Sequence, residues 1–306
     1  MERSGLTRAM TWGVGPRVMR RVPDDWTPRE YSLLELEPYT EVIGAEVRGV
    51  NLRAPLTDEL RAEIHAALLE WKVLFFRDQH VSSEQQLAFA HAFGELEQHP
   101  FLRQGDTSEV VRFEKGGYSE DPFSVGSENG WHTDVTWRAE PAMGAVLRAI
   151  EVPERAGDTL WADMACAYDN LPPDLRDRID GLHARHSFVH VFGYGMSDQQ
   201  MAEMLEKYPP VEHPVVRTHP ETGRRTLFVN AFFTERIVGI DAEESEWLID
   251  RLALQATHPE WHVRLRWEPG TVAFWDNRAT QHYASSDYYP SRRVMERVAI
   301  KGDRPS

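Results

Sequence analysis

The sequence has little cysteine, no long apolar run and a shortage of positive charge. Cys166 is the only cysteine in 306 residues, so an intrachain disulfide is impossible and a reducing compartment is expected. No apolar run approaches the roughly 20 residues that a membrane-spanning helix needs. Residues 1–25 carry scattered arginines without the apolar stretch of a secretory signal. These absences predict a cytoplasmic protein with no membrane partner.

Basic residues are outnumbered, because 49 Asp and Glu stand against 34 Lys and Arg and give a formal net charge of −15. Such a surface repels nucleic acids, so no nucleic-acid partner is expected. A small anionic substrate stays compatible with this charge, since a few arginines that converge on one pocket can make that pocket positive.

Length and composition predict an ordinary globular protein. Hydrophobic residues make up 41% and charged residues 27% of the chain, and a chain of this size buries enough surface to fold without disulfides. No internal repeat or long linker divides it. We interpret residues 1–30 as an N-terminal arm and residues 31–306 as a single domain.

Helical patterning is confined to a few segments. One helix is expected over residues 58–71 with Thr57 as its cap. A second should run from Ser82 to Gly94, with Gln85 placed for a capping box, and a third should begin at Asp241, with Glu244 three residues on. The residues that the third helix should bury are Trp247, Leu248 and Leu252.

Short strand-like runs are spread over both halves of the chain, which predicts a mainly β protein with flanking helices, either a β-sandwich or a jelly roll. Residues 220–223, Pro-Glu-Thr-Gly, predict the turn of a hairpin. The runs are residues 73–76, 110–113, 131–137, 145–152, 159–162, 215–218, 226–229, 263–267, 272–275 and 294–300.

His132 and Asp134 are the first candidate metal ligands. Residues i and i+2 of a strand point to the same face, so a strand over residues 131–137 would offer both side chains to one ion. His282 follows an apolar strand and a turn far along the chain, and a jelly roll brings early and late strands around one cavity. Two imidazoles and one carboxylate leave positions open for Fe(II) and oxygen chemistry, whereas zinc prefers a tetrahedral set.

Interpretations of these histidines that involve no metal ion stay open at this point. A His-x-Asp pair is common by chance and fits a surface histidine or one bonded to a neighbouring carboxylate. His183, His186 and His190 have mixed spacing and favour a solvated or structural role. His258 fits the end of a helix, where a cation is stabilised.

Six sequence blocks, in order, give the chain a resemblance to the taurine dioxygenase (TauD/TfdA-like) family, which also contains alkylsulfatase and aryloxyalkanoate dioxygenases. The resemblance runs from about residue 36 to residue 303. The blocks are WHTDVT (131–136), GDTLWAD (157–163), HPVVRTHPETG (213–223), LFVN (227–230), WDNRATQHYA (275–284) and DYYPSRRVMERV (287–298).

This resemblance implies a double-stranded β-helix, or jelly roll, with Fe(II) held by His132, Asp134 and His282 as the catalytic metal site. It implies 2-oxoglutarate and O2 as co-substrates. Arg293 would hold the distal carboxylate of 2-oxoglutarate with Thr159 as a hydroxyl donor, and the planar fork of arginine suits a carboxylate.

The resemblance also implies which residues contact the primary substrate. Arg297 has the same strand parity as Arg293 and would grip the anionic head of the primary substrate, with His99 as a further contact. Phe192 and Phe233 fall where relatives line the pocket, although core packing explains each phenylalanine about as well.

Two positions depart from the taurine enzymes, both on the substrate side. Leu102 stands where those enzymes carry a tyrosine, and Glu128 where they carry an asparagine, although the adjacent Asn129 could take that place. These departures weaken taurine as the substrate and leave the iron and 2-oxoglutarate assignments unchanged.

The expected activity is Fe(II)- and 2-oxoglutarate-dependent hydroxylation of a small anionic organic substrate. A sulfonate such as taurine, or an alkyl sulfonate or sulfate, would release sulfite or sulfate and an aldehyde. Carboxylates such as aryloxyalkanoates or natural-product intermediates are the alternative. A non-catalytic jelly-roll binding protein and a zinc hydrolase are remote alternatives. The resemblance favours a homodimer or homotetramer.

Overall fold

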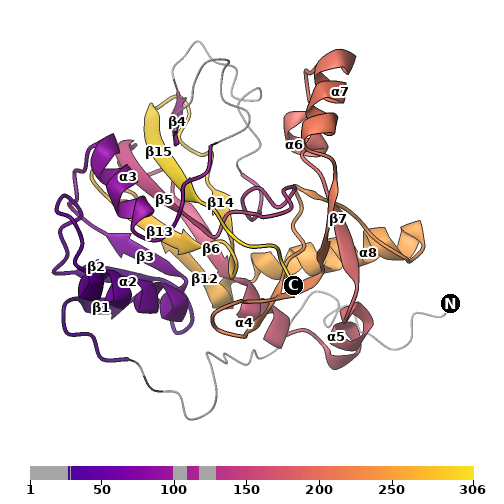
Figure 1. The fold of residues 1–306 in the computed structure, drawn as a ribbon, viewed down its shortest axis with the longest axis horizontal. Coiled ribbons are helices and arrows are strands. Elements are labelled where there is room, and N and C mark those ends of the chain that lie inside the picture. The colour runs from indigo at the N-terminus through magenta and orange to yellow at the C-terminus, as the bar shows by residue number, and fades with distance from the viewer. Residues whose placement is uncertain (1–26, 28, 99–108, 117–128) are drawn as a thin grey trace.

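The computed structural model describes residue 27 and residues 29–98, 109–116 and 129–306. The predictions for His99, Leu102 and Glu128, and nearly all of the N-terminal arm, lie outside the described residues. Within these ranges no helix combines the length and apolarity needed to cross a membrane. Strands form the centre of the molecule and helices lie at its edges (Figure 1).

The strands are short, and many follow the predicted runs. They are β1 (Glu35–Pro38), β2 (Ala45–Arg48), β3 (Val73–Phe76), β4 (Val110–Lys115), β5 (Gly144–Glu151), β6 (Thr159–Asp163), β7 (His183–His186), β8 (Val211–Pro214), β9 (Val216–Thr218), β10 (Arg225–Leu227), β11 (Thr234–Ile237), β12 (His262–Leu265), β13 (Val272–Asp276), β14 (Thr280–Ala284) and β15 (Arg293–Ile300).

The helices of the described residues include the three that the sequence predicts and several further ones. They are α2 (Asp58–Trp71), α3 (Ser83–His91), α4 (Met164–Asp169), α5 (Pro173–Ile179), α6 (Val189–Phe192), α7 (Asp198–Lys207) and α8 (Ala242–Ala253), with single 3-10 turns η1 (Leu254–Thr257) and η2 (Pro259–Trp261).

Two sheets build the central body. The larger has the strand order β1-β2-β3-β13-β5-β15-β4, and the smaller has the order β12-β6-β14. Strands far apart in sequence are neighbours, since β13 pairs with both β3 and β5, and β15 with both β5 and β4. Two mainly antiparallel sheets around one core form the predicted jelly roll with flanking helices, so this fold class is confirmed.

Side chains along the central strands point alternately into two separate hydrophobic cores. Phe75 and Trp275 point into the core between the two sheets, where their rings lie 5.6 and 5.8 Å from that of Trp161 on β6. Leu74 and Phe274 point to the opposite face of the large sheet, which α2 and α3 cover. The period of two along each strand therefore places one apolar set on the cavity side and the next under the helices.

The helix caps follow the sequence closely. Thr57 accepts a hydrogen bond from the backbone N–H of Leu60. Ser82 and Gln85 form the predicted capping box at the start of α3. The predicted hairpin is also confirmed, because β9 and β10 pair antiparallel on either side of residues 220–223.

Two local predictions are wrong. Trp247 is 49% exposed, whereas Leu248 and Leu252 are fully buried, because residues four apart share a helix face and their neighbour at 247 lies off that face. Residues 131–137 do not form a strand. Only His132 makes a single bridge, and residues 134–137 form a turn.

Four short helices, α4 to α7, were not predicted. α6 has only four residues, too few for a periodic pattern. α7 has a capping box from Ser197 and Gln200, and this sequence signal could have located it.

Candidate metal centre

The two candidate imidazoles meet where an isolated bridge joins distant parts of the chain. The backbone of His132 exchanges two hydrogen bonds with His282 of β14, at 3.1 and 2.8 Å. Residues directly opposite in an antiparallel pair place their side chains on the same face. The ring centroids accordingly lie 4.2 Å apart.

Asp134 reaches the same place from a turn. Its Oδ1 lies 3.9 Å from Nε2 of His132, and ligand atoms of His132, Asp134 and His282 all lie within 4.8 Å of one another. Val135 follows with a left-handed φ of 49°, which is costly for a β-branched residue. The predicted convergence of the three side chains is thus observed, but a strained turn produces it instead of strand alternation.

The imidazoles are held ready to act as ligands. Nδ1 of His132 donates to the carbonyl oxygen of Gly130 at 2.8 Å, so in the neutral ring the lone pair lies on Nε2, where a metal could bind. Burial, and after it the nearby His132, lower the pKa of His282 to about 3. His282 is therefore neutral at neutral pH, as a metal ligand must be.

Arg297 of β15 contacts this centre directly. Its Nη1 donates to Oδ1 of Asp134 at 2.7 Å, and its guanidinium lies 5.1 Å from the ring centroid of Phe113 on β4. Both ionic side chains are largely shielded from solvent, where such a pair is stronger than at the surface.

A cavity of about 70 Å³ lies beside these side chains. A single water needs roughly 10–15 Å³ by the same measure, so the cavity fits the end of a small ligand. Arg293 and Arg297 both face it, as their shared parity predicts. The lining residues are Phe113, His132, Leu147, Thr159, Trp275, His282, Ala284, Arg293 and Arg297.

Arg293 is fixed from two sides at the first position of β15. Its Nε donates to the carbonyl oxygen of Gly157 at 3.2 Å, and its guanidinium lies 5.7 Å from the ring centroid of Tyr288. Gly157 has a φ of +74°, and a Cβ there would lie 3.0 Å from Cδ and 3.1 Å from Nε of Arg293. Glycine at 157 is what allows this arginine to approach the loop.

Thr159, at the start of β6, is 2% exposed. Its hydroxyl oxygen accepts a hydrogen bond from Nε1 of Trp267 at 2.9 Å. Since the indole N–H can only donate, the threonine O–H proton stays available for an acceptor in the cavity.

An aromatic wall stands on the other side of His132. The ring of Phe232 stacks on that of His132, with centroids 4.7 Å apart and an interplanar angle of 14°. Phe233 meets the same imidazole edge-on, and Phe192 stacks on Phe233. Phe192 and Phe233 were expected to line the pocket, but neither lines this cavity. Phe232, which makes the closest ring contact with His132, was missed. Asn129 is exposed and does not line the cavity.

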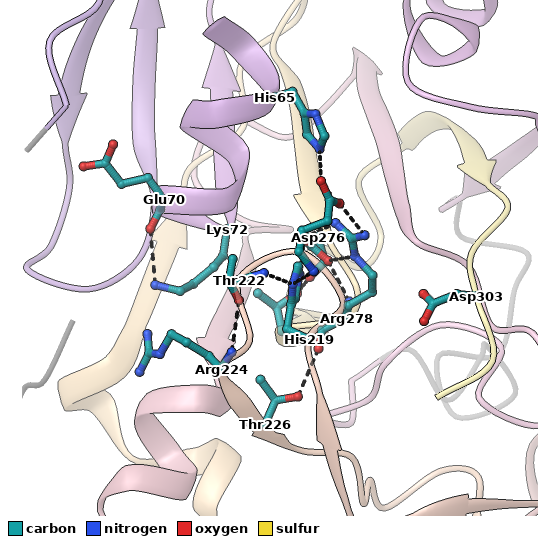
Figure 2. Close-up of polar contacts among 12 residues, drawn as sticks. His65, Glu70, Lys72, His219, Thr222, Arg224, Thr226, Asp276, Arg278 and Asp303 are labelled. Carbon is teal, nitrogen blue, oxygen red and sulfur yellow. Dashed lines mark hydrogen bonds and ion pairs between the residues drawn. The ribbon is translucent and has the colours of Figure 1, made fainter. Parts of the chain in front are cut away.

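A buried polar network supports the turn between β13 and β14 (Figure 2). Asp276 is bound by Nε and Nη2 of Arg278 at 2.9 and 2.7 Å, and His219 Nε2 donates to it at 3.0 Å. Burial raises the pKa of Asp276, but these cationic and donor partners outweigh it and hold the pKa well below its usual range. The network fixes the chain just before His282.

A second cavity, about 340 Å³, lies beside this network. Two of its cations are engaged by carboxylates, since Lys72 lies 3.1 Å from Asp163 and Arg224 lies 2.7 Å from Asp169. We interpret these pairs as structural.

Comparisons with known proteins agree with this geometry. Residues 35–299 match the family described as Taurine catabolism dioxygenase TauD, TfdA family. The chain is 38% identical over 279 residues to the "Alkylsulfatase" of Acinetobacter baylyi, covering 88% of this chain and 86% of that protein. It is 38% identical over 281 residues to the "Alpha-ketoglutarate-dependent sulfate ester dioxygenase" of Pseudomonas putida, covering 89% and 91%.

A solved structure extends the likeness to three dimensions. The crystal structure of a taurine dioxygenase from Burkholderia xenovorans matches this chain with a TM-score of 0.75 and 39% sequence identity, covering 90% of this chain and 93% of that one. The resemblance found in the sequence is thereby confirmed, and the chain belongs to the TauD/TfdA family of dioxygenases.

Proposed function

We propose that this protein is an Fe(II)- and 2-oxoglutarate-dependent dioxygenase that hydroxylates a small sulfate ester or sulfonate. The observation that carries the proposal is the convergence of His132, Asp134 and His282 beside a cavity. Two arginines, Arg293 and Arg297, line the same cavity. Membership of a dioxygenase family supports the reaction class, and the two relatives named for sulfate chemistry support the substrate class.

The donor set fits iron. Two neutral imidazoles and one carboxylate are the ligands that non-haem Fe(II) oxygenases use, with positions left open for co-substrates. When bound, Fe(II) would supply the activation of O2 that is coupled to oxidative decarboxylation of 2-oxoglutarate to succinate and carbon dioxide. His132, Asp134 and His282 would hold the ion.

Arg293 and Thr159 would bind 2-oxoglutarate. Both line the cavity, both are buried, and they come from different sheets, Arg293 from β15 of the larger and Thr159 from β6 of the smaller. A guanidinium together with a hydroxyl proton is a donor set matched to a carboxylate. The apolar walls from Leu147, Trp275 and Ala284 would keep water away from the reacting end.

Arg297 would bind the anionic head of the primary substrate, with His99 as a further contact, and Phe192 and Phe233 would form an aromatic wall behind His132. The ion pair of Arg297 with Asp134 brings the guanidinium to the metal ligands. A head group bound there would hold the adjacent carbon beside the metal, which determines the carbon that is hydroxylated.

The stoichiometry follows from the chemistry of such a substrate. One oxygen atom of O2 enters succinate, and the other enters the C–H bond next to the head group. The hydroxylated carbon then expels sulfate from an ester, or sulfite from a sulfonate, as it becomes an aldehyde carbonyl. One substrate, one 2-oxoglutarate and one O2 thus yield aldehyde, sulfate or sulfite, succinate and carbon dioxide.

A substrate panel tests the proposal. The purified chain is loaded with Fe(II) without oxygen, then given 2-oxoglutarate, O2 and matched alkyl sulfates, alkyl sulfonates, taurine or aryloxyalkanoates. We expect succinate and sulfate in equal amounts with an alkyl sulfate. Succinate with an aryloxyalkanoate alone would move the substrate to the carboxylates. Sulfate release without O2 would indicate a hydrolase and overturn the proposal.

Assembly and location are part of the same proposal. A homodimer or homotetramer is expected from the family likeness, and light scattering on the eluted protein measures it directly. A cytoplasmic location suits an enzyme that takes 2-oxoglutarate as co-substrate.

A further inference from the structure

The side-chain amide of Asn230 joins two segments that meet at the candidate metal centre. Asn230 follows β10 and is 1% exposed. Its Oδ1 accepts hydrogen bonds from the backbone N–H groups of Phe232 and Phe233, at 3.1 and 3.0 Å. Its Nδ2 donates to the hydroxyl oxygen of Thr136 at 3.1 Å.

Each end of this connection leads to a candidate metal ligand. Thr136 lies two residues after Asp134, in the turn that presents the carboxylate. Phe232 stacks on the ring of His132. It also packs so closely against Gly130 that a Cβ on this glycine would lie 2.1 Å from the Phe232 ring. Gly130 in turn accepts the Nδ1 proton of His132.

The turn with Asp134 needs such support. Val135 has a left-handed φ of 49°, and a strained backbone persists only where its surroundings hold it. Thr136 is fully buried and makes a second contact, 3.0 Å from Nδ1 of His186. Its hydroxyl is therefore anchored by two side chains from different elements.

We propose that Asn230 is a positioning residue that holds the Asp134 turn and the Phe232–Phe233 loop in one fixed arrangement. It would thereby set the distance between the carboxylate and the imidazole of His132. Only an amide meets the demand, because Oδ1 accepts two backbone protons while Nδ2 donates to Thr136. This inference rests on the proposed function, since it assumes that the three ligands bind one metal ion.

Metal affinity measured without turnover tests the inference. We would titrate the intact chain with Mn(II), follow free Mn(II) by electron paramagnetic resonance, and measure urea unfolding of each metal-free variant. Asn230→Ala and Thr136→Val should each raise the Kd for Mn(II) about 10- to 100-fold, the usual cost of losing a partner behind the ligands. The double variant should not multiply these losses, because both single changes remove the same hydrogen bond.

Two further variants separate positioning from general stability. Thr136→Ser keeps the hydroxyl and should bind Mn(II) nearly as wild type does. Gln79→Ala is the matched control, since Gln79 is a buried amide that links backbone segments through Leu52, Val50 and Arg77 and does not line the cavity. It should lower the free energy of unfolding without changing the Kd.

The outcomes are distinct. A folded Asn230→Ala variant with the wild-type Kd would overturn the inference and leave the proposed function standing. If Asn230→Ala does not fold, the comparison of Thr136→Val with Thr136→Ser decides in its place, and equal Kd values would overturn the inference. A wild-type chain that binds no Mn(II) would overturn the proposed function, and the inference with it.

Discussion

Nη1 of Arg297 lies 2.7 Å from Oδ1 of Asp134. The two side chains are 163 residues apart in sequence and only 14% and 8% exposed. An anion that binds Arg297 must therefore share this guanidinium with the carboxylate, or replace the carboxylate on it. Under the proposed function, this one side chain would link substrate binding to the charge at the candidate metal centre.

Replacing Arg297 tests that link. Arg297→Ala should lower kcat/KM for an anionic substrate about 10- to 150-fold, because a hydrogen bond to a charged group is worth about 1.5–3 kcal/mol. The Kd for 2-oxoglutarate should stay unchanged, since Arg293 is retained. Arg225→Ala is the control, because Arg225 is an exposed arginine paired with Asp180. Normal coupled turnover by Arg297→Ala would contradict the assignment.

Gly157→Ala should displace Arg293. The new Cβ would lie 3.0 Å from Cδ of Arg293, so we expect a higher Kd for 2-oxoglutarate with unchanged Mn(II) binding. Gly181→Ala provides the matched control, since Gly181 has a similar φ of +70° and nothing within 4 Å of an added Cβ. Both variants should lose comparable stability in urea. If both bind 2-oxoglutarate equally well, Arg293 does not hold the co-substrate.

Metal binding should stabilise the fold. A ligand present at 100 times its Kd stabilises the native state by about 2.7 kcal/mol if it does not bind the unfolded chain. We expect Mn(II) to raise the unfolding midpoint of the wild-type protein and a chelator to reverse the shift. Asp134→Ala should show no shift, because the remaining two imidazoles bind too weakly. A full shift in this variant would place the metal elsewhere.

Stability should fall in mild acid. Burial lowers the pKa of His213 from 6.5 to about 4. Below pH 6.5 the unfolded chain therefore binds a proton at this histidine, whereas the folded chain binds it only when the pH approaches 4. The free energy of unfolding then decreases as pH falls from 6.5 to about 4, by up to about 1.4 kcal/mol per pH unit from this group.

His213→Gln isolates that contribution. The glutamine can still donate to the carbonyl oxygen of Arg138, which Nε2 of His213 contacts at 2.8 Å. Urea unfolding of the variant across this pH range should show a slope that is shallower by about one proton. An unchanged slope would mean that His213 titrates alike in both states.

Local sequence signals predicted the local structure. The caps at Thr57, Ser82 and Asp241 depend on residues within three positions, and all three form as expected. The hairpin around residues 220–223 is equally local. The three candidate metal ligands were proposed from their residue types and from the family blocks, and the structure brings their side chains together. The strand-like run at residues 131–137 was misleading, because these residues form a single bridge and a turn.

The sequence by itself determined the chemistry available to this protein: two imidazoles, a carboxylate and two arginines, all within the blocks that resemble the family. Tertiary structure decided how these groups meet. The turn at Asp134 depends on Thr136 and Asn230, which are 94 residues apart, and on Phe232 stacked against His132. Such contacts stabilise a strained backbone that local propensity disfavours, so they become visible only once the sheets have packed.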